Sequence, residues 1–456
     1  MLLSGGGMTG FRRRIWESEI EVLRMVDGIF IHSVKLETEY LSTEWMEDVK
    51  FCVDKAREND LELWIYDEDK WPSGAAGGKV SRVNPAEFTA RALTMECGKA
   101  GELAVPAKLS NEEERTVTGD SDSLMCGGNR SVDEISCLAG TAVEDLAVEE
   151  TMETEFLQGV YVIQTAADGR FIKRMKEYLT YEEAAGACGV DEEILLLRQE
   201  ISGKSEWYNG LMPPDNLNPE SVKTFLKLTH EHYEEVFGGS FPKEVKGFFT
   251  DEPNCCDFFS VFHEGRPWIP WSIGFTEYFI EKRGYDPQEK LPYLFFDGEG
   301  AEKIRHDYWK TVAQRFEESY MKQVYEWCDK RGLRTTGHIL YENDLGYQTR
   351  VCGAAMPQLR YLHNPGIDLL GAQTDEYLTV KQCASVAHQY ERSMTISEAY
   401  GCTGWELDFS TQKWLGDWQF ALGITRRCQH LAPVFHYWLQ EEGLSAGFQL
   451  SEYLVG

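Results

Sequence analysis

The sequence predicts an α/β protein: a (β/α)8 barrel of the TIM type with a small β-rich insertion after the second strand. Three observations support this prediction. Short apolar runs alternate with longer amphipathic segments along most of the 456 residues, which is typical of parallel strands connected by helices. Eight such runs can be counted, and the alternation is interrupted once, between residues 98 and 204.

The alternation starts with an apolar run at 28–32 (GIFIH) and a second at 61–66 (LELWIY). Between them, residues 44–59 place their apolar side chains on one face of a helix. Ser42 precedes this segment and is a suitable N-cap, because its hydroxyl can accept a hydrogen bond from the first turn. This order predicts a β-α-β unit with parallel strands.

Residues 98–204 differ in composition, with acidic and Ser/Gly-rich stretches, a strand candidate at 159–165 and a turn at Asp168-Gly169. We interpret this range as an inserted β-rich subdomain, since long insertions add little loop-closure entropy. The predicted organisation is therefore a first barrel part at 1–97, the insertion at 98–204 and a second barrel part at 205–456.

The alternation then resumes, with helices expected at 219–237, 301–331 and 411–431. The remaining strand candidates are 205–208, 245–250, 333–338, 367–370, 394–397 and 433–437. A doubly wound open sheet is the structural alternative, but it normally carries a glycine-rich phosphate turn after its first strand. The run Gly5-Gly6-Gly7 precedes the first strand, so it does not serve as that turn.

The charge excludes several classes of function. The net charge is -31, from 45 Lys and Arg against 76 Asp and Glu, whereas nucleic-acid binding requires basic patches. An anionic membrane surface and strongly anionic substrates are disfavoured for the same reason.

No apolar run is long enough for a membrane helix, and no secretory signal is evident. The 12 Cys lack C-x-x-C or zinc-site spacing, which predicts a reducing, cytoplasmic location.

Polar residues follow most of the predicted strands. They are His32, then Asp67-Glu68-Asp69, Asp251-Glu252, His338 with Glu342, Gln373 with Asp375, and Glu398. Catalytic groups of (β/α)8 barrels cluster at the carboxyl ends of the strands. One such carboxylate would be read as a helix cap, but several strand ends of this kind together predict a polar pocket.

Glu252 and Glu398 are the candidate catalytic pair. Hydrolysis of a glycosidic bond uses one carboxylic acid to protonate the leaving oxygen and a second carboxylate as base or nucleophile. Asp251 lies beside Glu252, and a like charge nearby raises a carboxyl pKa. The fourth and seventh strands end on opposite sides of a barrel mouth, so the two carboxylates can flank one bond. Salt bridges are the structural alternative for both.

The other strand-end residues are candidate substrate contacts. Asp67, Glu68 and Asp69 place three carboxylates close together, which suits sugar hydroxyls or, in principle, calcium. Trp71 could form a flat wall for a sugar ring, or could equally pack under its own loop. His338 could donate to a hydroxyl, although a core histidine is nearly as common. His32, Asp251, Glu342 and Gln373 complete the set, and no metal ligand is assigned.

Five motifs together resemble the barrel domain of the α-L-rhamnosidase-like glycoside hydrolases (family 106 and relatives). They are WIYDEDKWPSGAAGG (64–78), GFFTDEP (247–253), GHILYE (337–342), NPGIDLLG (364–371) and ISEAYG (396–401). The resemblance covers about residues 28–438 and implies an inverting mechanism with Glu252 as general acid and Glu398 as general base. These two labels could be exchanged. The resemblance also implies a calcium ion near the site, with ligands that the sequence does not place.

The leading hypothesis is therefore a glycosidase that acts on an α-L-rhamnoside or a related sugar, with an oligosaccharide or glycoside as its partner. A non-catalytic carbohydrate-binding protein on a truncated or decayed barrel is the alternative. A metal-dependent barrel hydrolase is a third, which would need several histidines near strand ends, and the chain has 10 His in all. The sequence leaves the sugar, the linkage and the oligomeric state open.

Overall fold

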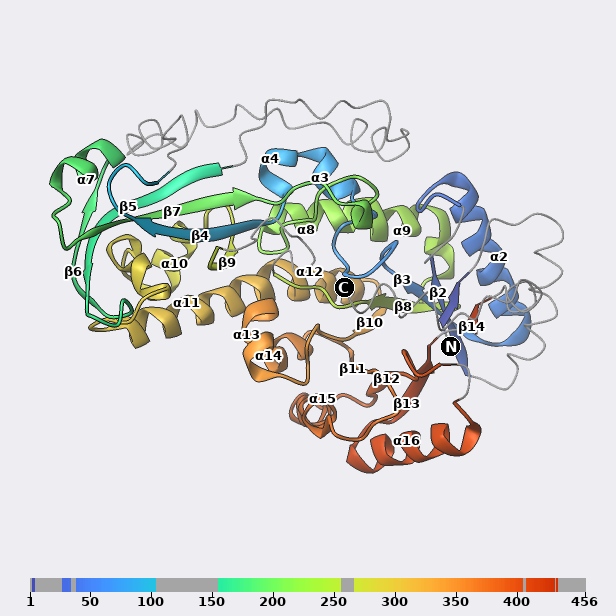
Figure 1. The fold of residues 1–456 in the computed structure, drawn as a ribbon. Helices are drawn as coiled ribbons and strands as arrows, with labels where there is room; N and C mark the ends of the chain where they lie inside the picture. Colours follow the sequence, from blue (N-terminus) through green and yellow to red (C-terminus); the bar gives the residue numbers. More distant parts are fainter. Residues whose placement is uncertain are drawn as a thin grey trace. The chain divides into compact units, whose positions relative to one another are not determined.

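The computed structural model describes residues 2–4, 27–33, 38–103, 155–255, 266–404, 407–430 and 432–433 (Figure 1). The chain divides into two compact units, each assembled from separate stretches. The first unit comprises Met1–Gly77, Val222–Asn254 and Glu317–Gly456, and the second comprises Gly78–Ser221 and Cys255–Phe316.

A parallel sheet forms the centre of the first unit. Its strands pair in the order β13-β12-β11-β10-β8-β3-β2-β1-β14, and every described pairing is parallel. Their bounds are β1 Leu2–Ser4, β2 Gly28–His32, β3 Glu62–Tyr66, β8 Val245–Thr250, β10 Arg334–Gly337, β11 Asn364–Leu369, β12 Ile396–Ala399, β13 Arg426–Gln429 and β14 Ala432–Pro433.

The sheet curls, so that strands distant in its order face one another. Side chains of β2, β3 and β8 form one core cluster with those of β12 and β13; its members are Phe30, Trp64, Tyr66, Phe249, Ile396 and Cys428. The ring of Phe30 stacks on Trp64 at 5.6 Å and meets Phe249 edge-on at 5.4 Å. Alternate residues of β3, Leu63 and Ile65, are fully buried on the opposite face, as expected for strands covered on both sides.

Helices cover the outer face of this sheet, with α15 and α16 beside β11 to β13 in Figure 1. Ser42 caps α2 by accepting from the Trp45 amide at 3.2 Å, which confirms the predicted start of that helix. The helices are α2 Thr43–Asn59, α8 Pro219–Leu226, α9 His232–Phe237, α12 Lys322–Asp329, α13 Leu345–Cys352, α14 Ala355–Leu359, α15 Tyr377–Gln389 and α16 Phe409–Leu422, with π-helical turns at Lys227–Glu231 and Glu317–Met321 and a 3-10 turn at Gly238–Ser240.

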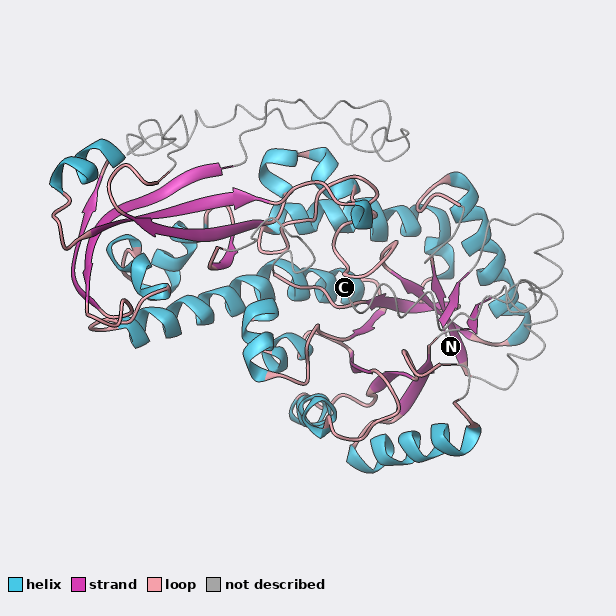
Figure 2. Cartoon of the chain, in the orientation of Figure 1, coloured by secondary structure: helices cyan, strands magenta, loops and turns pink. Residues whose placement is uncertain are grey.

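The second unit contains an antiparallel sheet in the order β6-β5-β7-β4-β9, whose long strands stand out in Figure 2. Its strands are β4 Arg91–Gly98, β5 Glu155–Thr165, β6 Ile172–Tyr178, β7 Glu193–Ile201 and β9 Trp268–Trp271. Its helices are α3 Lys79–Val83, α4 Pro85–Phe88, α7 Tyr181–Ala187, α10 Phe275–Arg283 and α11 Ala301–Phe316, with 3-10 turns at Glu206–Tyr208 and Gln288–Leu294. Strands β5, β6 and β7 fall inside the range 98–204 predicted to be a β-rich insertion; its folding as a separate subdomain stays a prediction.

The prediction of a closed (β/α)8 barrel is wrong for the part of the chain that the structure describes. The parallel sheet is a half-barrel in which seven strands have four to six residues, while β1 and β14 have three and two. The predicted third strand at 205–208 lies in the second unit and is a 3-10 turn. Ser205 caps this turn and Asn209 ends it in a left-handed conformation (φ 56°), so the short aromatic run cannot extend into a strand.

The end of the sheet also differs from expectation. A helix was predicted over 411–431, but α16 ends at Leu422, and Gly423 adopts a φ of 117° that favours glycine. Strand β13 follows at Arg426–Gln429 and lies at the end of the sheet order. Its sequence RRCQ is polar, so it lacks the apolar pattern from which a strand would be predicted. Of the predicted strand at 433–437, only Pro433 lies within the described residues.

Among the described residues, no helix is both long and apolar enough to span a membrane. The cysteines in the described ranges are free thiols.

Candidate active site

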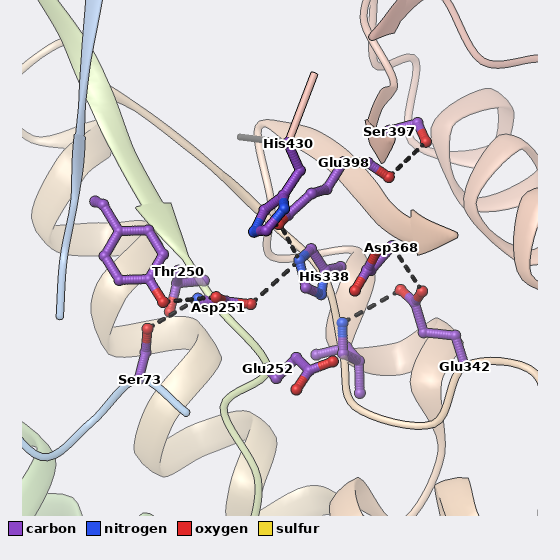
Figure 3. A network of polar contacts seen from close by, with 12 residues as sticks. Ser73, Thr250, Asp251, Glu252, His338, Glu342, Asp368, Ser397, Glu398 and His430 are labelled. Atoms are coloured by element: carbon purple, nitrogen blue, oxygen red, sulfur yellow. Dashed lines mark hydrogen bonds and ion pairs between the residues drawn. The ribbon is translucent and has the colours of Figure 1, made fainter. Parts of the chain in front are cut away.

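The carboxyl ends of six parallel strands bring polar side chains together in the first unit. Strand β3 leads to Asp67, β8 to Asp251 and Glu252, and β10 to His338. Asp368 and Glu398 lie near the ends of β11 and β12, and His430 follows β13. Figure 3 shows the side chains of Asp251, Glu252, Asp368, Glu398 and His430 gathered around His338. Of the predicted residues, Asp251, Glu252, His338, Glu342 and Glu398 are brought into one cluster.

His338 links two of the carboxylates. Its Nε2 lies 3.0 Å from Oε2 of Glu398 and 3.2 Å from Oδ1 of Asp251. Its Nδ1 is buried and has no hydrogen-bond partner among the described residues. Nε2 carries at most one proton, so it can donate to only one of the two carboxylates at a time. The other carboxylate is held only if a second proton is present.

Asp251 is fixed from two further sides. The Tyr66 hydroxyl donates to its Oδ2 at 2.6 Å, and its backbone N–H donates to Oγ of Ser73 at 2.8 Å. The Ser73 hydroxyl in turn donates to Oδ1 of Asp67 at 2.6 Å. Burial raises the pKa of Asp251 to about 6, against the lowering effect of His338. The loop after β3 therefore determines where the Asp251 carboxylate lies.

Glu398 is enclosed by two histidines. Nε2 of His430 lies 3.3 Å from Oε1, on the carboxylate oxygen that His338 does not contact. Burial raises the pKa of Glu398 to about 8. Burial, together with His338, lowers the pKa of His430 to about 4, so this ring is neutral at pH 7 and donates or accepts without a charge.

Glu252 occupies a backbone conformation that side chains rarely adopt, with a φ of 46°. Such strain persists at functional sites when the surroundings over-determine the position. Ligand atoms of Glu252, His338 and Asp368 lie within 4.8 Å of one another. Burial and the neighbouring Asp251 and Asp368 raise the pKa of Glu252 well above its usual range, which favours the protonated acid.

Glu342 connects the loop after β10 to β11. Its Oε1 accepts from the Ile339 amide at 3.2 Å and its Oε2 from the Asp368 amide at 3.1 Å. Burial raises its pKa well above the usual range. This carboxyl group therefore positions Asp368, while Oδ1 of Asp368 is buried without a hydrogen-bond partner among the described residues.

The first two acids of the Asp67-Glu68-Asp69 motif point into the protein. Glu68 is fully buried and accepts five backbone N–H groups; its donors are Asp69 at 2.9 Å, Gly74 at 3.1 Å, Ala75 at 2.7 Å, Ala76 at 2.8 Å and Gly77 at 2.6 Å. Burial raises its pKa to about 7, and these amides oppose the rise. Asp67 is also fully buried, and its Oδ2 lies 4.0 Å from His230. This geometry does not favour direct contact of Asp67 or Glu68 with a substrate.

The remaining predicted residues lie around this cluster. His32 is buried, with its ring 3.7 Å from that of Tyr66, and burial lowers its pKa well below the usual range. The side chain of Asp69 lies 3.7 Å from Lys70, and Trp71 is half-buried in the same loop. The Gln373 oxygen accepts from the Asp375 and Glu376 amides at 2.8 and 3.3 Å, so Gln373 holds its own turn.

Sequence reasoning missed three members of the cluster. Asp368 lies inside a strand between apolar residues, where only inward alternation along β11 could have identified it. His430 follows β13, which lies within the range 411–431 predicted to be a helix. Tyr66 was counted as strand core, yet its hydroxyl reaches Asp251.

Two groups of described side chains have the spacing of metal ligands. Calcium takes six to eight oxygen ligands, whereas the two candidate groups each pair two carboxylates with the His338 nitrogen; they are Asp251-His338-Glu398 and Glu252-His338-Asp368. The Asp67-Glu68-Asp69 motif is not a third group, because the Glu68 oxygens are occupied by backbone amides. The calcium ion implied by the resemblance stays a prediction.

No known protein-family profile matches the chain, and no curated protein matches it. Among solved structures, the chain is similar to a rhamnosidase from Novosphingobium sp. PP1Y, with a TM-score of 0.58 and 14% sequence identity. The match covers 95% of this chain and 54% of that one, so the chain spans about half the length of that structure. The comparison shows a rhamnosidase-like fold.

Proposed function

We propose that the chain is a glycoside hydrolase that cleaves a terminal α-L-rhamnoside or a related sugar by inversion, with Glu252 as general acid and Glu398 as general base. The observation that carries this proposal is the cluster in which both glutamates lie around His338, each with a raised carboxyl pKa. The rhamnosidase-like fold supports the choice of sugar, by analogy alone.

The electrostatics favour this distribution of roles. Glu252 is surrounded by like charges that add to the effect of burial, so it holds its proton and can give it to the glycosidic oxygen as the carbon–oxygen bond breaks. Glu398 is contacted by two histidines, His338 and His430, which can donate to its ionised form. It can then take a proton from the water that attacks the anomeric carbon.

His338 and Asp251 are positioning residues in this mechanism. Asp251 is held by Tyr66 and Ser73, and it holds His338 in turn. These contacts hold the imidazole of His338 against Glu398, and they therefore fix the orientation of the Glu398 carboxylate. Oδ1 of Asp368 has no hydrogen-bond partner among the described residues, so Asp368 is the group best placed to accept a hydrogen bond from a sugar hydroxyl.

The test is hydrolysis of a panel of nitrophenyl glycosides that includes the α-L-rhamnoside. Wild type should turn over one of them, and Glu398→Gln should lower kcat by about 10²- to 10⁴-fold, the usual contribution of a general base. Glu252→Gln should also lower kcat, but by less, because a nitrophenolate leaving group needs little protonation. Glu326→Gln, on α12 with a side chain 46% exposed, is the matched control and should retain activity.

Two outcomes would reject the proposal. One is activity that neither glutamate variant lowers. The other is wild-type protein that binds the sugar and turns over none of the panel, which would instead support the carbohydrate-binding alternative. Following the reaction by NMR gives the first anomer of the product and tests inversion separately.

A further inference from the structure

A cavity of about 370 Å³ is lined by residues on or beside the parallel strands, and none of them belongs to the cluster of carboxylates around His338, called the carboxylate cluster below. The residues that line it include the first residue of several strands; among them are Glu62 of β3, Asn364 of β11 and Arg426 of β13. The carboxylates lie instead at the carboxyl ends of the strands. Its volume falls within the range of about 300–1,000 Å³ that is usual for small-molecule sites.

On the side of β3 and β8, aromatic side chains lie between this cavity and the carboxylate cluster. Along β3, Glu62, Trp64 and Tyr66 project to the same face because side chains alternate in a strand. Glu62 and Trp64 line the cavity, whereas the Tyr66 hydroxyl reaches Asp251. The Tyr66 ring stacks on Phe249 at 5.8 Å. The cavity therefore shares no lining residue with the proposed active site.

The cavity wall contains an unused hydrogen-bond donor. Asn364 is 2% exposed, and its Nδ2 has no hydrogen-bond partner among the described residues. Buried amide groups are nearly always paired, and an unpaired one requires an explanation. A ligand oxygen in the cavity would supply the missing acceptor.

The charges of the lining balance. Asp27 and Glu62 oppose Arg426 and Arg427, and Arg426 lies 3.4 Å from Asp27 and 3.7 Å from Glu62. A lining without net charge favours a neutral ligand over an ion. Its carboxylates still accept from hydroxyl groups, and Trp64 adds an apolar wall.

We propose that this cavity is a second, non-catalytic ligand site for a neutral polyhydroxylated molecule of monosaccharide size. One ring oxygen or hydroxyl accepts from Asn364, other hydroxyls donate to Glu62 or Asp27, and the apolar face of the ring packs on Trp64. The inference does not depend on hydrolysis, because it uses no residue of the carboxylate cluster.

Calorimetric titration with L-rhamnose, D-glucose and myo-inositol tests it. The protein is used in the Glu252→Gln, Glu398→Gln background, so that turnover does not contribute heat. We expect saturable binding of at least one of the three. Asn364→Asp replaces the donor by an acceptor, and Met394→Trp fills the cavity from its lining; each should weaken that binding about tenfold or more.

Met394→Leu is the matched control, since it changes the same position without adding volume, and it should bind as the parent does. If Asn364→Asp fails to fold, as judged by its thermal transition, the Met394 pair decides alone. Absence of saturable binding of all three compounds overturns the proposal. Binding that neither cavity variant weakens also overturns it, because the sugar would then lie elsewhere.

Discussion

At the residue scale, the chemistry of the site follows from the number of acids around one imidazole. Asp251 and Glu398 both contact His338 within 3.2 Å, and ligand atoms of Glu252 and Asp368 lie within 4.8 Å of it. Carboxyl groups this close together, two of them buried and two half-buried, cannot all ionise, because like charges and burial both disfavour the ionised form. The cluster therefore titrates as a unit and retains protons at neutral pH.

The pH dependence of the rate follows from these pKa shifts. Glu398 must be ionised to act as base, and its pKa is raised to about 8. Glu252 must stay protonated, and its pKa is raised well above its usual value. We expect kcat/KM to increase as pH rises towards about 8 and to fall at higher pH, when Glu252 ionises. Maximal activity at about pH 4–5, where unperturbed carboxyl groups titrate, would contradict this account.

Much of the site could be anticipated from which residues follow each strand. Placing Asp251, Glu252, His338 and Glu398 at strand ends was sufficient to group them, because parallel strands end at one edge. The roles of buried residues could not be read in this way. The Glu68 sequence context does not reveal that five amides surround its carboxylate, because those contacts depend on how the following loop folds back.

At the element scale, the loop after β3 supports the site. Residues 69–77 wrap around the Glu68 carboxylate, and the same loop supplies Ser73 to Asp251. Two π-helical turns contact the residues before this loop and at the end of β8. One places His230 near Asp67, and the other places the Tyr320 hydroxyl 2.8 Å from Oγ1 of Thr250. Irregular helical turns of this kind are frequent at functional sites.

Replacing Glu68 should therefore loosen the loop. Glu68→Gln removes the charged acceptor and puts an N–H2 group against backbone donors, so we expect a loss of unfolding free energy on the order of 2–3 kcal/mol. Activity should fall as well, through Ser73. Chemical denaturation measures the loss. Glu58→Gln, an exposed acid on α2, should change stability by less than about 0.5 kcal/mol, and equal effects of the two variants would reject the anchoring role.

Elements with clear periodicity were predicted well, and those with polar sequences were not. The helix α2 starts at its predicted cap, because the cap and the apolar stripe agree. The strand β13 was assigned to a helix because RRCQ lacks strand alternation; the Arg426 side chain is instead paired with Asp27 and Glu62. Tertiary pairing outweighs local propensity at such positions.

At the scale of the whole molecule, the cluster should reduce stability as pH rises. Carboxyl groups of Asp251, Glu68 and Glu398 have pKa values raised to about 6, 7 and 8 in the folded chain. The folded state therefore binds protons more tightly than the unfolded chain, whose carboxyl groups titrate near pH 4. The stability they contribute is complete below about pH 4 and is lost as pH rises towards about 8.

Glu398→Gln tests this directly, because it removes one of the raised carboxyl groups without removing its volume. We expect the variant to gain about 1–2 kcal/mol over wild type at about pH 9, a typical gain when an active-site strain is relieved, and to gain less at about pH 5. Thermal unfolding at both pH values provides the comparison. A variant less stable than wild type at pH 9 would show that Glu398 stabilises the fold.

The assignment of Glu252 as general acid and Glu398 as general base can be tested by how the rate of each variant depends on the leaving group. A dinitrophenyl glycoside needs little protonation of its leaving oxygen, whereas an alkyl glycoside of the same sugar needs it fully. We predict that Glu252→Gln retains most of its kcat on the dinitrophenyl substrate, whereas its kcat on the alkyl substrate falls by about 10²-fold or more. For Glu398→Gln, kcat should fall on both substrates. Equal losses on both substrates for Glu252→Gln, or selective sparing in Glu398→Gln, would contradict the assignment.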